Sequence, residues 1–255
     1  MSQLETMGWE RKGKVARIIF DRPQMLNTMN NRATLDLNMI VDSIAKEDTI
    51  RVVVITGNGR SFSTGIDLKE LSTGQIEMVY HHRWERALRT LETMEKIVVA
   101  GIKEYCLGGG LQLALACDVR VATDNAILGL PGIREGLIPG LATYRLPQYI
   151  GLGRAKRLVL SGENINAQEA QRIGLVDYIV PLAEFETQLE EIVGHYLRVC
   201  SVGTIKSKAL CNLSPELDYD AFLRKYFELQ EIAQTSEDHF EARQAYLQKR
   251  EPVFR

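Results

Sequence analysis

The sequence is poor in cysteine and has no long hydrophobic run. Its 255 residues include only four cysteines, Cys106, Cys117, Cys200 and Cys211, and none of them forms a C-x-x-C pair. This spacing excludes a disulfide framework and indicates no zinc site, so we interpret all four as reduced thiols in packed positions. No stretch approaches the roughly 20 apolar residues that span a bilayer, and the N-terminus has no apolar signal region. We therefore expect a cytoplasmic protein with no membrane partner.

An excess of charge of one sign is also missing. The chain carries 31 basic and 33 acidic residues for a formal net charge of -2, and the basic residues are scattered along it. This balance argues against nonspecific nucleic-acid binding. With 45% hydrophobic residues the chain can bury a substantial core, which fits one large domain or a domain with a helical appendage.

Apolar patterning is present along the first two thirds of the chain and alternates between two periods. Strands are predicted at Lys14–Phe20, Val52–Ile55 and Ile97–Ile102. The second of these is wholly apolar, which is typical of a strand buried between packed layers. Helical spacing is found at Asn30–Lys46 and, in a more polar form, at Gln75–Met94. This recurrence of strand and helix predicts an α/β fold.

After Arg154 the strand pattern largely disappears. Helices are predicted at Ala155–Ser161, Ala167–Ile173, Glu184–Val199, Asp218–Ala233 and Asp238–Arg250. No linker rich in proline or glycine separates these helices from the rest. We divide the chain into a core of residues 1–200 and a C-terminal helical region of residues 201–255, with a soft boundary.

Two glycine clusters are the most informative local features. Gly108, Gly109 and Gly110 lead directly into an apolar helical segment, where unpaired amides favour an anion. Gly65 and Ile66 follow a predicted strand and supply a second amide if the fold brings the two loops together. Taken singly, glycines more often mark tight turns, and neither cluster has a complete phosphate-binding fingerprint.

Several further motifs, found in a fixed order along the chain, make a functional interpretation of the two glycine clusters more specific. They are Gly59–Leu68, Tyr105–Gly110 with Cys117 and Asp118, Gly136–Gly140, Ala167–Ala170, Gly174–Val176, Phe240 and Tyr246–Phe254. In order and spacing these segments resemble the enoyl-CoA hydratase/isomerase (crotonase) family over nearly the whole chain. The resemblance implies a spiral of ββα units with a C-terminal helical region used for trimerisation, assembled as a homotrimer or hexamer.

The resemblance also implies a substrate and a site. The substrate is an acyl-CoA, with no cofactor beyond the CoA that the substrate itself carries. Its thioester carbonyl oxygen is placed between the backbone amides of Ile66 and Gly109. Such preorganised donors stabilise an enolate oxygen, and one donor is typically worth about 3 to 4 kcal/mol of barrier.

Further residues are assigned to CoA by the same resemblance. Those on the subunit's own loops are Met25, Leu26, Ser63, Gly65, Asp67 and Leu68. Lys249 and Phe254 are placed against the nucleotide of a neighbouring subunit. For these last two, an ordinary solvated lysine and a packing aromatic are equally good interpretations.

The sequence departs from the family at the two positions where hydratases carry glutamates that hold and activate water. These positions are Gln112 and Gly132. An amide has no useful proton affinity near neutral pH and glycine has no side chain, so the usual acid/base pair is missing. The turn at 140–146 is also one residue shorter than the common form. Ordinary hydration of a short enoyl-CoA is therefore not expected.

Three substitutes for the missing carboxylates are considered. Glu135 lies three residues after Gly132, although a carboxylate there is more often solvated or paired. Tyr144 lies in the altered turn, where a wall aromatic is the more common role. The helix around Tyr80 borders the acyl pocket in the family, but His81 and His82 diverge by about 100° and cannot both face it. No histidine spacing suggests a metal site.

Gly132 itself suggests a hypothesis about the substrate. Without a side chain there, space is left beside the acyl α-carbon for a water, a small anion or a bulky substrate group, which Gln112 is placed to hydrogen-bond.

The main interpretation of the whole sequence is an enzyme acting through an enolate, by isomerisation, carbon–carbon cleavage, decarboxylation, thioester hydrolysis or atypical hydration. A non-catalytic acyl-CoA-binding protein is the alternative. A Clp-type serine peptidase is set aside because glycines and Leu111 occupy the region where its serine is required.

Overall fold

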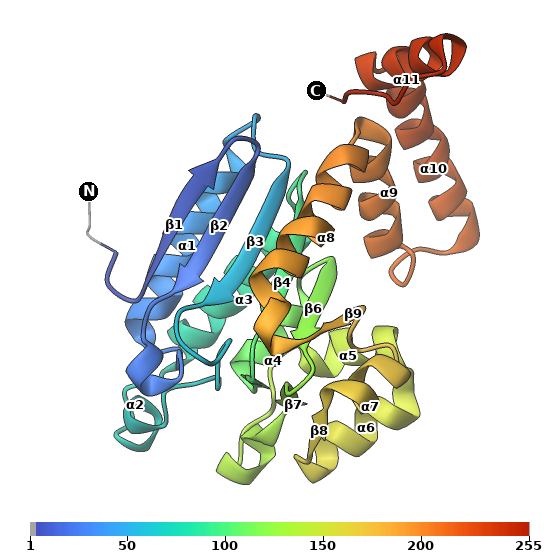
Figure 1. Cartoon of the computed structure of the whole chain (residues 1–255). Coiled ribbons are helices and arrows are strands. Elements are labelled where there is room, and N and C mark those ends of the chain that lie inside the picture. Colours follow the sequence, from blue (N-terminus) through green and yellow to red (C-terminus); the bar gives the residue numbers. More distant parts are fainter. Residues whose placement is uncertain (1–3, 255) are drawn as a thin grey trace.

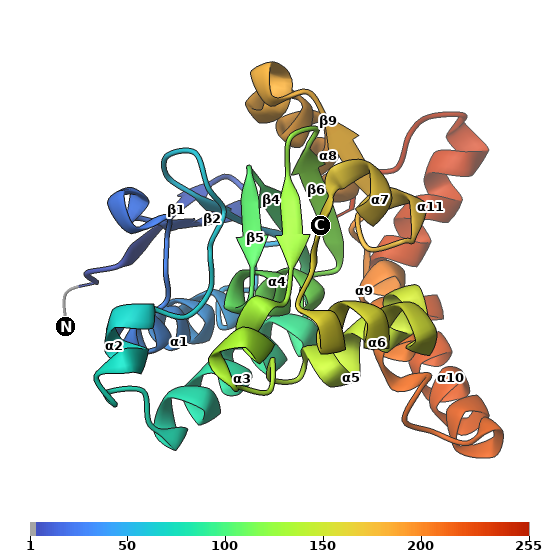
Figure 2. The same cartoon turned by 90° about the horizontal axis from the view of Figure 1, so that it is seen from below.

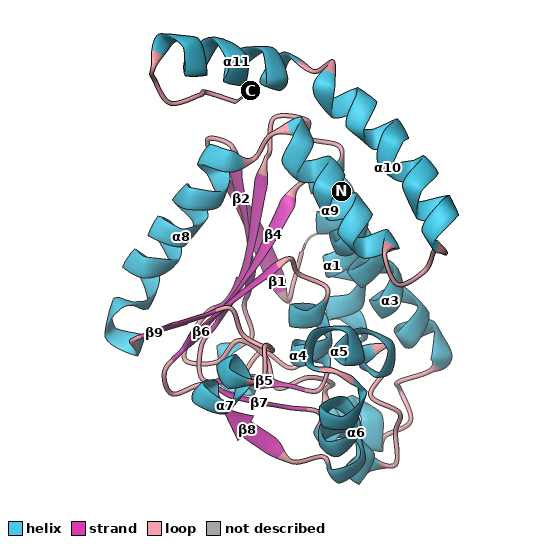
Figure 3. Ribbon diagram, turned by 90° about the vertical axis from the view of Figure 1, so that its right-hand side faces the viewer, coloured by secondary structure: helices cyan, strands magenta, loops and turns pink. Residues whose placement is uncertain are grey.

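The computed structural model describes residues 4–254 and contains two β-sheets. The larger sheet has the strand order β1-β2-β3-β4-β6-β9, parallel except for the antiparallel β1-β2 hairpin. Its strands are β1 Met7–Lys12, β2 Val15–Phe20, β3 Val52–Gly57, β4 Ile97–Ile102, β6 Val119–Thr123 and β9 Tyr178–Val180. The smaller sheet has the order β5-β7-β8 (Figure 3), formed by β5 Tyr105–Leu107, β7 Ile127–Gly129 and β8 Asn164–Asn166. Figure 2 shows β5 near β4 and β6 of the larger sheet.

Helices follow most strands and then dominate the C-terminal part of the chain (Figure 1). They are α1 Asn31–Ala45, α2 Leu68–Ser72, α3 Met78–Thr93, α4 Gly109–Leu115, α5 Ala142–Ile150, α6 Leu152–Ser161, α7 Ala167–Arg172, α8 Phe185–Val199, α9 Val202–Leu213, α10 Tyr219–Gln234 and α11 Glu237–Gln248. Short 3-10 helices occur at Pro23–Met25, Pro131–Glu135 and Leu182–Glu184. Across residues 4–254, no helix combines the length and apolar character that crossing a membrane requires.

The larger sheet is covered on both faces. On β3, Val53 and Ile55 join the apolar cluster shared with α1 and α3, whereas Val52 and Val54 join the cluster shared with α8. Figure 3 shows α8 on one side of the sheet and α1 and α3 on the other. Because every residue of β3 is buried, its sequence can be apolar without alternation. The predicted buried strand is confirmed.

The predicted elements of the first two thirds are confirmed, with small shifts in their ends. The helix predicted from Asn30 begins at α1, where the side chain of Asn30 accepts a hydrogen bond of 2.9 Å from the amide of Ala33. The pattern missed β1, because this edge strand is largely solvated and carries three charged residues in six. It also missed β5, β7, β8 and β9, which are only three residues long and too short for a periodicity. The five-residue β6 and the helices α2, α5 and α9 were missed as well.

The C-terminal helices divide into one that joins the core and two that leave it. On α9, Ile205 packs into the cluster under α8, and Lys208 Nζ lies 2.8 Å from the carboxylate of Asp118. By contrast, α10 and α11 extend away from the sheet (Figure 1). Cys211 on α9 is exposed, which corrects our interpretation that all four cysteines are packed; the other three are buried. The division at residue 200 stays a prediction.

Candidate active site

The loop after β3 runs alongside β5, and this brings the two glycine clusters together. Ser63 and Cys106 form a parallel bridge. The amide of Ser63 donates to the carbonyl of Tyr105 over 3.0 Å, and the amide of Leu107 donates to the carbonyl of Ser63 over 2.9 Å. The condition under which Gly65-Ile66 supplies a second amide is therefore met by strand-like pairing of segments about 40 residues apart.

The approach of the two loops requires glycine. A Cβ atom on Gly65 would lie 2.8 Å from the carbonyl oxygen of Leu107 and 2.9 Å from the amide of Gly109, and Gly65 also has a φ of +90°. A Cβ on Gly110 would lie 2.6 Å from the carbonyl oxygen of Ser63. Both distances to backbone oxygens are shorter than any real Cβ contact, so these glycines hold the backbones close and do more than form turns.

Two amides at this junction have no acceptor. Within residues 4–254, neither Ile66 N–H nor Gly109 N–H donates a backbone hydrogen bond. Their neighbours do: the amide of Asp67 donates to Met29 over 3.0 Å, and the amide of Gly108 donates to Gly129 over 2.9 Å. Because the flanking peptides are held in place, the two free donors are preorganised toward whatever lies beside them.

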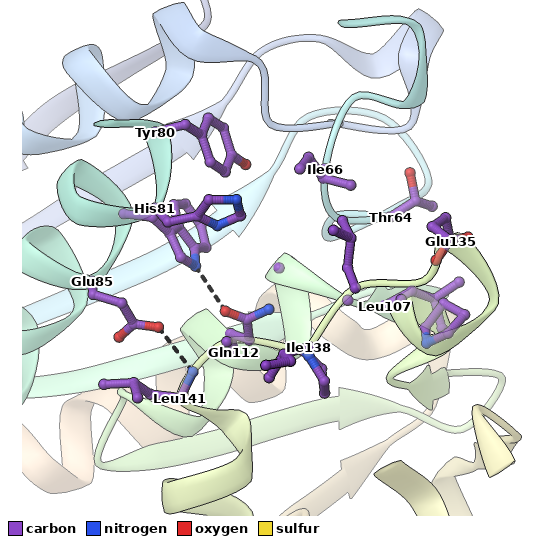
Figure 4. Close-up of a pocket in the computed structure, with 18 of the residues that line it drawn as sticks. Thr64, Ile66, Tyr80, His81, Glu85, Leu107, Gln112, Glu135, Ile138 and Leu141 are labelled. Atoms are coloured by element: carbon purple, nitrogen blue, oxygen red, sulfur yellow. Dashed lines mark hydrogen bonds between the residues drawn. The ribbon is translucent and has the colours of Figure 1, made fainter. Parts of the chain in front are cut away.

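Beside these amides lies a pocket of about 520 Å³ (Figure 4). Its lining comes from the loop after β3, from α3, from the start of α4 and from the segment that links β7 to α5. The lining residues are Thr28, Thr64, Ile66, Leu68, Tyr80, His81, Trp84, Glu85, Leu107, Gly108, Gly109, Gln112, Pro131, Gly132, Glu135, Leu137, Ile138, Pro139, Gly140, Leu141 and Thr143. The pocket is mostly apolar with a few convergent polar groups, as small-molecule sites are.

Glu135 lies next to Gly132, the position of one missing glutamate. A Cβ on Gly132 would meet only the Oε2 atom of Glu135, at 3.8 Å. Space is therefore present beside Gly132, and the carboxylate of Glu135 borders it. No other described residue forms a hydrogen bond or ion pair with Glu135, and Figure 4 shows its side chain across the pocket from His81.

His81 faces the pocket from α3, whereas His82 is exposed outside it. This confirms that the two histidines cannot share the pocket. Burial lowers the pKa of His81 below its usual 6.5; the positive charge of His82 also lowers this pKa, while Glu85 opposes the shift. His81 therefore favours the neutral imidazole near pH 7. The neighbouring Tyr80 is buried, and burial raises the pKa of its hydroxyl.

The lowered pKa of His81 predicts a pH-dependent stability. The unfolded chain takes up a proton on this histidine near pH 6.5, before the folded protein does, so stability falls as the pH drops through that value. We expect the Tm of the His81→Asn variant to fall less than that of the wild type between about pH 7.5 and about pH 5.5. Differential scanning fluorimetry at the two pH values measures this, and an equal fall in both proteins would contradict it.

Ser63 and Asp67, assigned to CoA by resemblance, have buried side chains that support the loop, and their contact with CoA stays a prediction. Ser63 is fully buried, donates to the carbonyl of Asn27 over 2.8 Å and accepts from the amide of Gly65 over 3.1 Å. Asp67 pairs with Arg22 over 3.0 Å. Burial acts to raise the pKa of Asp67, but hydrogen bonds and the charge of Arg22 outweigh it and lower this pKa. Their side chains position the Ile66 amide and do not line the pocket.

Of the remaining assigned residues, some line the pocket and others lie outside it. Leu68 lines it, and Met25 and Leu68 are exposed where a ligand can reach them. Tyr144 lies outside it, with its hydroxyl 3.3 Å from the carboxylate of Glu216, so the structure does not support Tyr144 as a proton donor. Lys249 and Phe254 lie at the C-terminus and do not reach this subunit's pocket. Their contact with a neighbouring subunit stays a prediction.

The sequence interpretation missed the residues that hold the altered turn. Glu85 accepts from the amide of Leu141 over 3.1 Å (Figure 4). It also accepts from Arg145 over 2.8 Å. Arg145 is 4% exposed and also pairs with Glu92. One signal was available, because Glu85 lies four residues after His81 and therefore on the same face of α3. Nothing in the sequence pattern indicated its partner 60 residues away.

Comparison with known proteins agrees with this geometry. The family model of enoyl-CoA hydratase/isomerase matches residues 10–255. The chain belongs to this family. It is 32% identical to the short-chain-enoyl-CoA hydratase of Clostridium acetobutylicum, with 97% of each chain covered. It is 33% identical to the 2,3-dehydroadipyl-CoA hydratase of Escherichia coli, with 96% of each covered.

Solved structures of the family confirm the predicted fold. The enoyl-CoA hydratase from Bacillus anthracis superposes with a TM-score of 0.92 at 31% identity, over 98% of this chain and 99% of that one. A second family structure, the putative enoyl-CoA hydratase from Streptomyces coelicolor, gives a TM-score of 0.94 at 26% identity. The chain is thus an acyl-CoA-processing enzyme of the enoyl-CoA hydratase/isomerase family, with the crotonase fold.

Proposed function

We propose that this enzyme converts its acyl-CoA through a thioester enolate held by the amides of Ile66 and Gly109. The observation that carries the proposal is that these two amides lack acceptors at the wall of a largely apolar pocket. When an α-proton is removed, negative charge develops on the thioester oxygen, and two preorganised donors in a water-poor site stabilise that charge. CoA then contacts the exposed Met25 and Leu68 and the half-buried Leu26.

We further propose that Glu135 is the proton-transfer group. Position 112 is an amide and position 132 has no side chain, so neither acts as acid or base, and Glu135 is the carboxylate that borders the space over Gly132. Glu135 takes the α-proton, and the C–H electron pair moves into the enolate. Removal of the α-proton leads to isomerisation. The same two amides would stabilise the enolate left when a carbon–carbon bond breaks in cleavage or decarboxylation, or the oxyanion formed when water attacks the thioester. These reactions, or an atypical hydration, are favoured over the reaction named for the relatives.

Deuterium exchange tests enolate formation without knowledge of the final product. A saturated acyl-CoA such as butyryl-CoA is incubated with the enzyme in D₂O, and incorporation at the α-carbon is followed by mass spectrometry. We expect exchange that requires the enzyme. Binding by calorimetry without exchange or turnover, across saturated thioesters of increasing chain length, would overturn the proposal in favour of a non-catalytic acyl-CoA-binding protein.

The Glu135→Gln variant tests the proton-transfer role. We expect a loss of about 10²–10⁴-fold in the exchange rate, because an amide cannot accept the proton, with little change in acyl-CoA affinity. Glu191→Gln is the matched control, since Glu191 is exposed on α8, which packs against the opposite face of the sheet. A Glu135→Gln enzyme with the wild-type exchange rate would assign the proton transfer to another group, such as His81.

We also propose that the chain assembles as a homotrimer or a hexamer of two trimers. Large apolar side chains on α10 and α11 are exposed in the single chain, among them Phe227 at 60%, Phe240 at 56% and Leu247 at 74%. Such a surface fits an interface between copies. Light scattering coupled to size-exclusion chromatography measures the state, and a monomer at micromolar concentration would contradict this assembly.

A further inference from the structure

We propose that Gln112 is a fixed hydrogen-bond donor for a carbonyl oxygen on the β-carbon of the acyl group, which makes 3-oxoacyl-CoA thioesters the preferred ligands. The inference deepens the proposed function, because it relies on the thioester being held at Ile66 and Gly109. Gln112 follows Gly109 by three residues, about 4.5 Å farther along α4. Its amide is therefore level with the first carbons of the acyl chain and not with the thioester carbonyl.

The orientation of the Gln112 amide follows from its partner. Trp84 Nε1 lies 3.2 Å from Gln112 Oε1. An indole N–H is only a donor, so the hydrogen bond has to end on the amide oxygen and not on the NH₂ group. The NH₂ group is then turned away from Trp84. It has no acceptor among the described residues and lies at the pocket wall (Figure 4).

Packing keeps both partners in place. Trp84 is 3% exposed, and its Cζ2 atom lies 3.5 Å from the position of a Cβ on Gly109. On the other side, a Cβ on Gly140 would lie 2.4 Å from Gln112 Oε1, so the absence of a side chain in the altered turn makes room for the amide. The side chain of Gln112 is thus held between α3 and the turn, with its NH₂ group as the part free to bind a ligand.

Both carboxylate oxygens of Glu85, which lines the same pocket, already accept hydrogen bonds. Its Oε1 atom accepts from the amide of Leu141 over 3.1 Å, and its Oε2 atom accepts from Arg145 over 2.8 Å. Gln112 Oε1 is occupied as well. A ligand hydroxyl beside Gln112 would bring a proton that neither Gln112 nor Glu85 can accept, which leaves only His81 and Glu135 elsewhere in the lining to accept it. A carbonyl brings only an acceptor, and this matches the free NH₂ group.

The hydroxyl groups of Tyr80 and Thr143, which also line the pocket, already donate their protons to backbone carbonyls. Tyr80 donates to the carbonyl of Met29 over 3.1 Å, and Thr143 donates to the carbonyl of Gly140 over 2.9 Å. Neither proton is therefore available to a ligand without loss of a structural hydrogen bond. Gln112 supplies two uncommitted N–H donors here, in addition to the one on the imidazole of His81, and a purely alkyl acyl chain would leave those of Gln112 buried and unpaired.

Isothermal titration calorimetry with three thioesters of equal carbon number tests the inference. The ligands are acetoacetyl-CoA, 3-hydroxybutyryl-CoA and butyryl-CoA. We expect acetoacetyl-CoA to bind at least about tenfold more tightly than butyryl-CoA, because a donor site rejects a ligand that leaves it unpaired. Tightest binding by 3-hydroxybutyryl-CoA, or equal binding by all three, would overturn it.

Acetoacetyl-CoA is also more acidic than butyryl-CoA, and this acidity alone could strengthen its binding. Two variants separate that effect from the hydrogen bond donated by Gln112. The Gln112→Leu substitution nearly conserves side-chain volume. In this variant the dissociation constant of butyryl-CoA divided by that of acetoacetyl-CoA should fall about tenfold. In Trp84→Phe the Gln112 amide is still present but loses the hydrogen bond that orients it, so the same ratio should fall by less. An unchanged ratio in folded Gln112→Leu, with its fold checked by circular dichroism, would refute the role of Gln112. Since α-exchange on butyryl-CoA does not involve a β-oxygen, failure here is distinguishable from failure of the enolate proposal.

Discussion

Replacing Gly109 by proline should lower the rate of α-proton exchange by about 10²–10³-fold, because it removes one of the two donors to the enolate oxygen. Gly109 is the first residue of α4, where proline is well tolerated since the amide at this position has no partner within the helix. The substitution therefore deletes the N–H group with little cost to the helix. The exchange rate on butyryl-CoA and the Tm are measured together.

Gly109→Ala is the matched control for the proline variant. A Cβ atom at this position meets the Cα of Gly65 and the ring of Trp84 at 3.5 Å, an ordinary contact, and the N–H group is kept. We expect the alanine enzyme to retain most of the exchange activity. If the proline variant folds and exchanges as fast as the alanine variant, the Gly109 amide does not stabilise the enolate.

Replacing Arg145 by methionine should destabilise the protein by about 3–5 kcal/mol, because it leaves Glu85 without its cation and leaves Glu92 only the longer pair with Arg89 at 3.5 Å. Arg145 is 4% exposed and binds Glu85 over 2.8 Å and Glu92 through a second pair of contacts. Urea unfolding followed by circular dichroism measures the change. The turn that carries Leu141 should also loosen, since Glu85 loses the partner that orients it.

The charge argument predicts a rescue. Combining Arg145→Met with Glu85→Gln and Glu92→Gln removes the unpaired carboxylates and should restore much of the lost stability. Arg154→Met is the control, because Arg154 is exposed on α6. A triple variant as unstable as Arg145→Met alone would assign the effect to the packing of the Arg145 side chain and not to its charge.

Because the two glutamates are absent, the reaction of the relatives cannot be assigned to this chain from sequence similarity alone. Both curated relatives compared above are named as hydratases, at 32% and 33% identity. The family relationship establishes the fold and the class of substrate. The reaction depends on which group moves protons, and positions 112 and 132 of this chain carry no carboxylate. The reaction is therefore better sought by exchange and binding experiments than by transfer of a relative's name.

Elements whose signals are local could be predicted from the order of the residues alone. The buried strand at β3 and the helix α1 with its Asn30 cap follow from periods and capping chemistry within a few residues. The two glycine clusters located the free amides of Ile66 and Gly109, since only glycine allows such a close approach of backbones. Short strands such as β9 and the exposed edge strand β1 carry too little apolar pattern to be predicted.

The directions in which individual side chains point depend on the folded chain and could not be predicted from the sequence. Tyr144 turns away from the pocket and Ser63 is fully buried, although motif position made both of them candidates. Gln112 becomes a donor because Trp84, 28 residues earlier, occupies its oxygen, and the carboxylate of Glu135 borders the space that Gly132 leaves. These outcomes depend on contacts between segments far apart in the chain, and a periodicity or a motif does not contain that information.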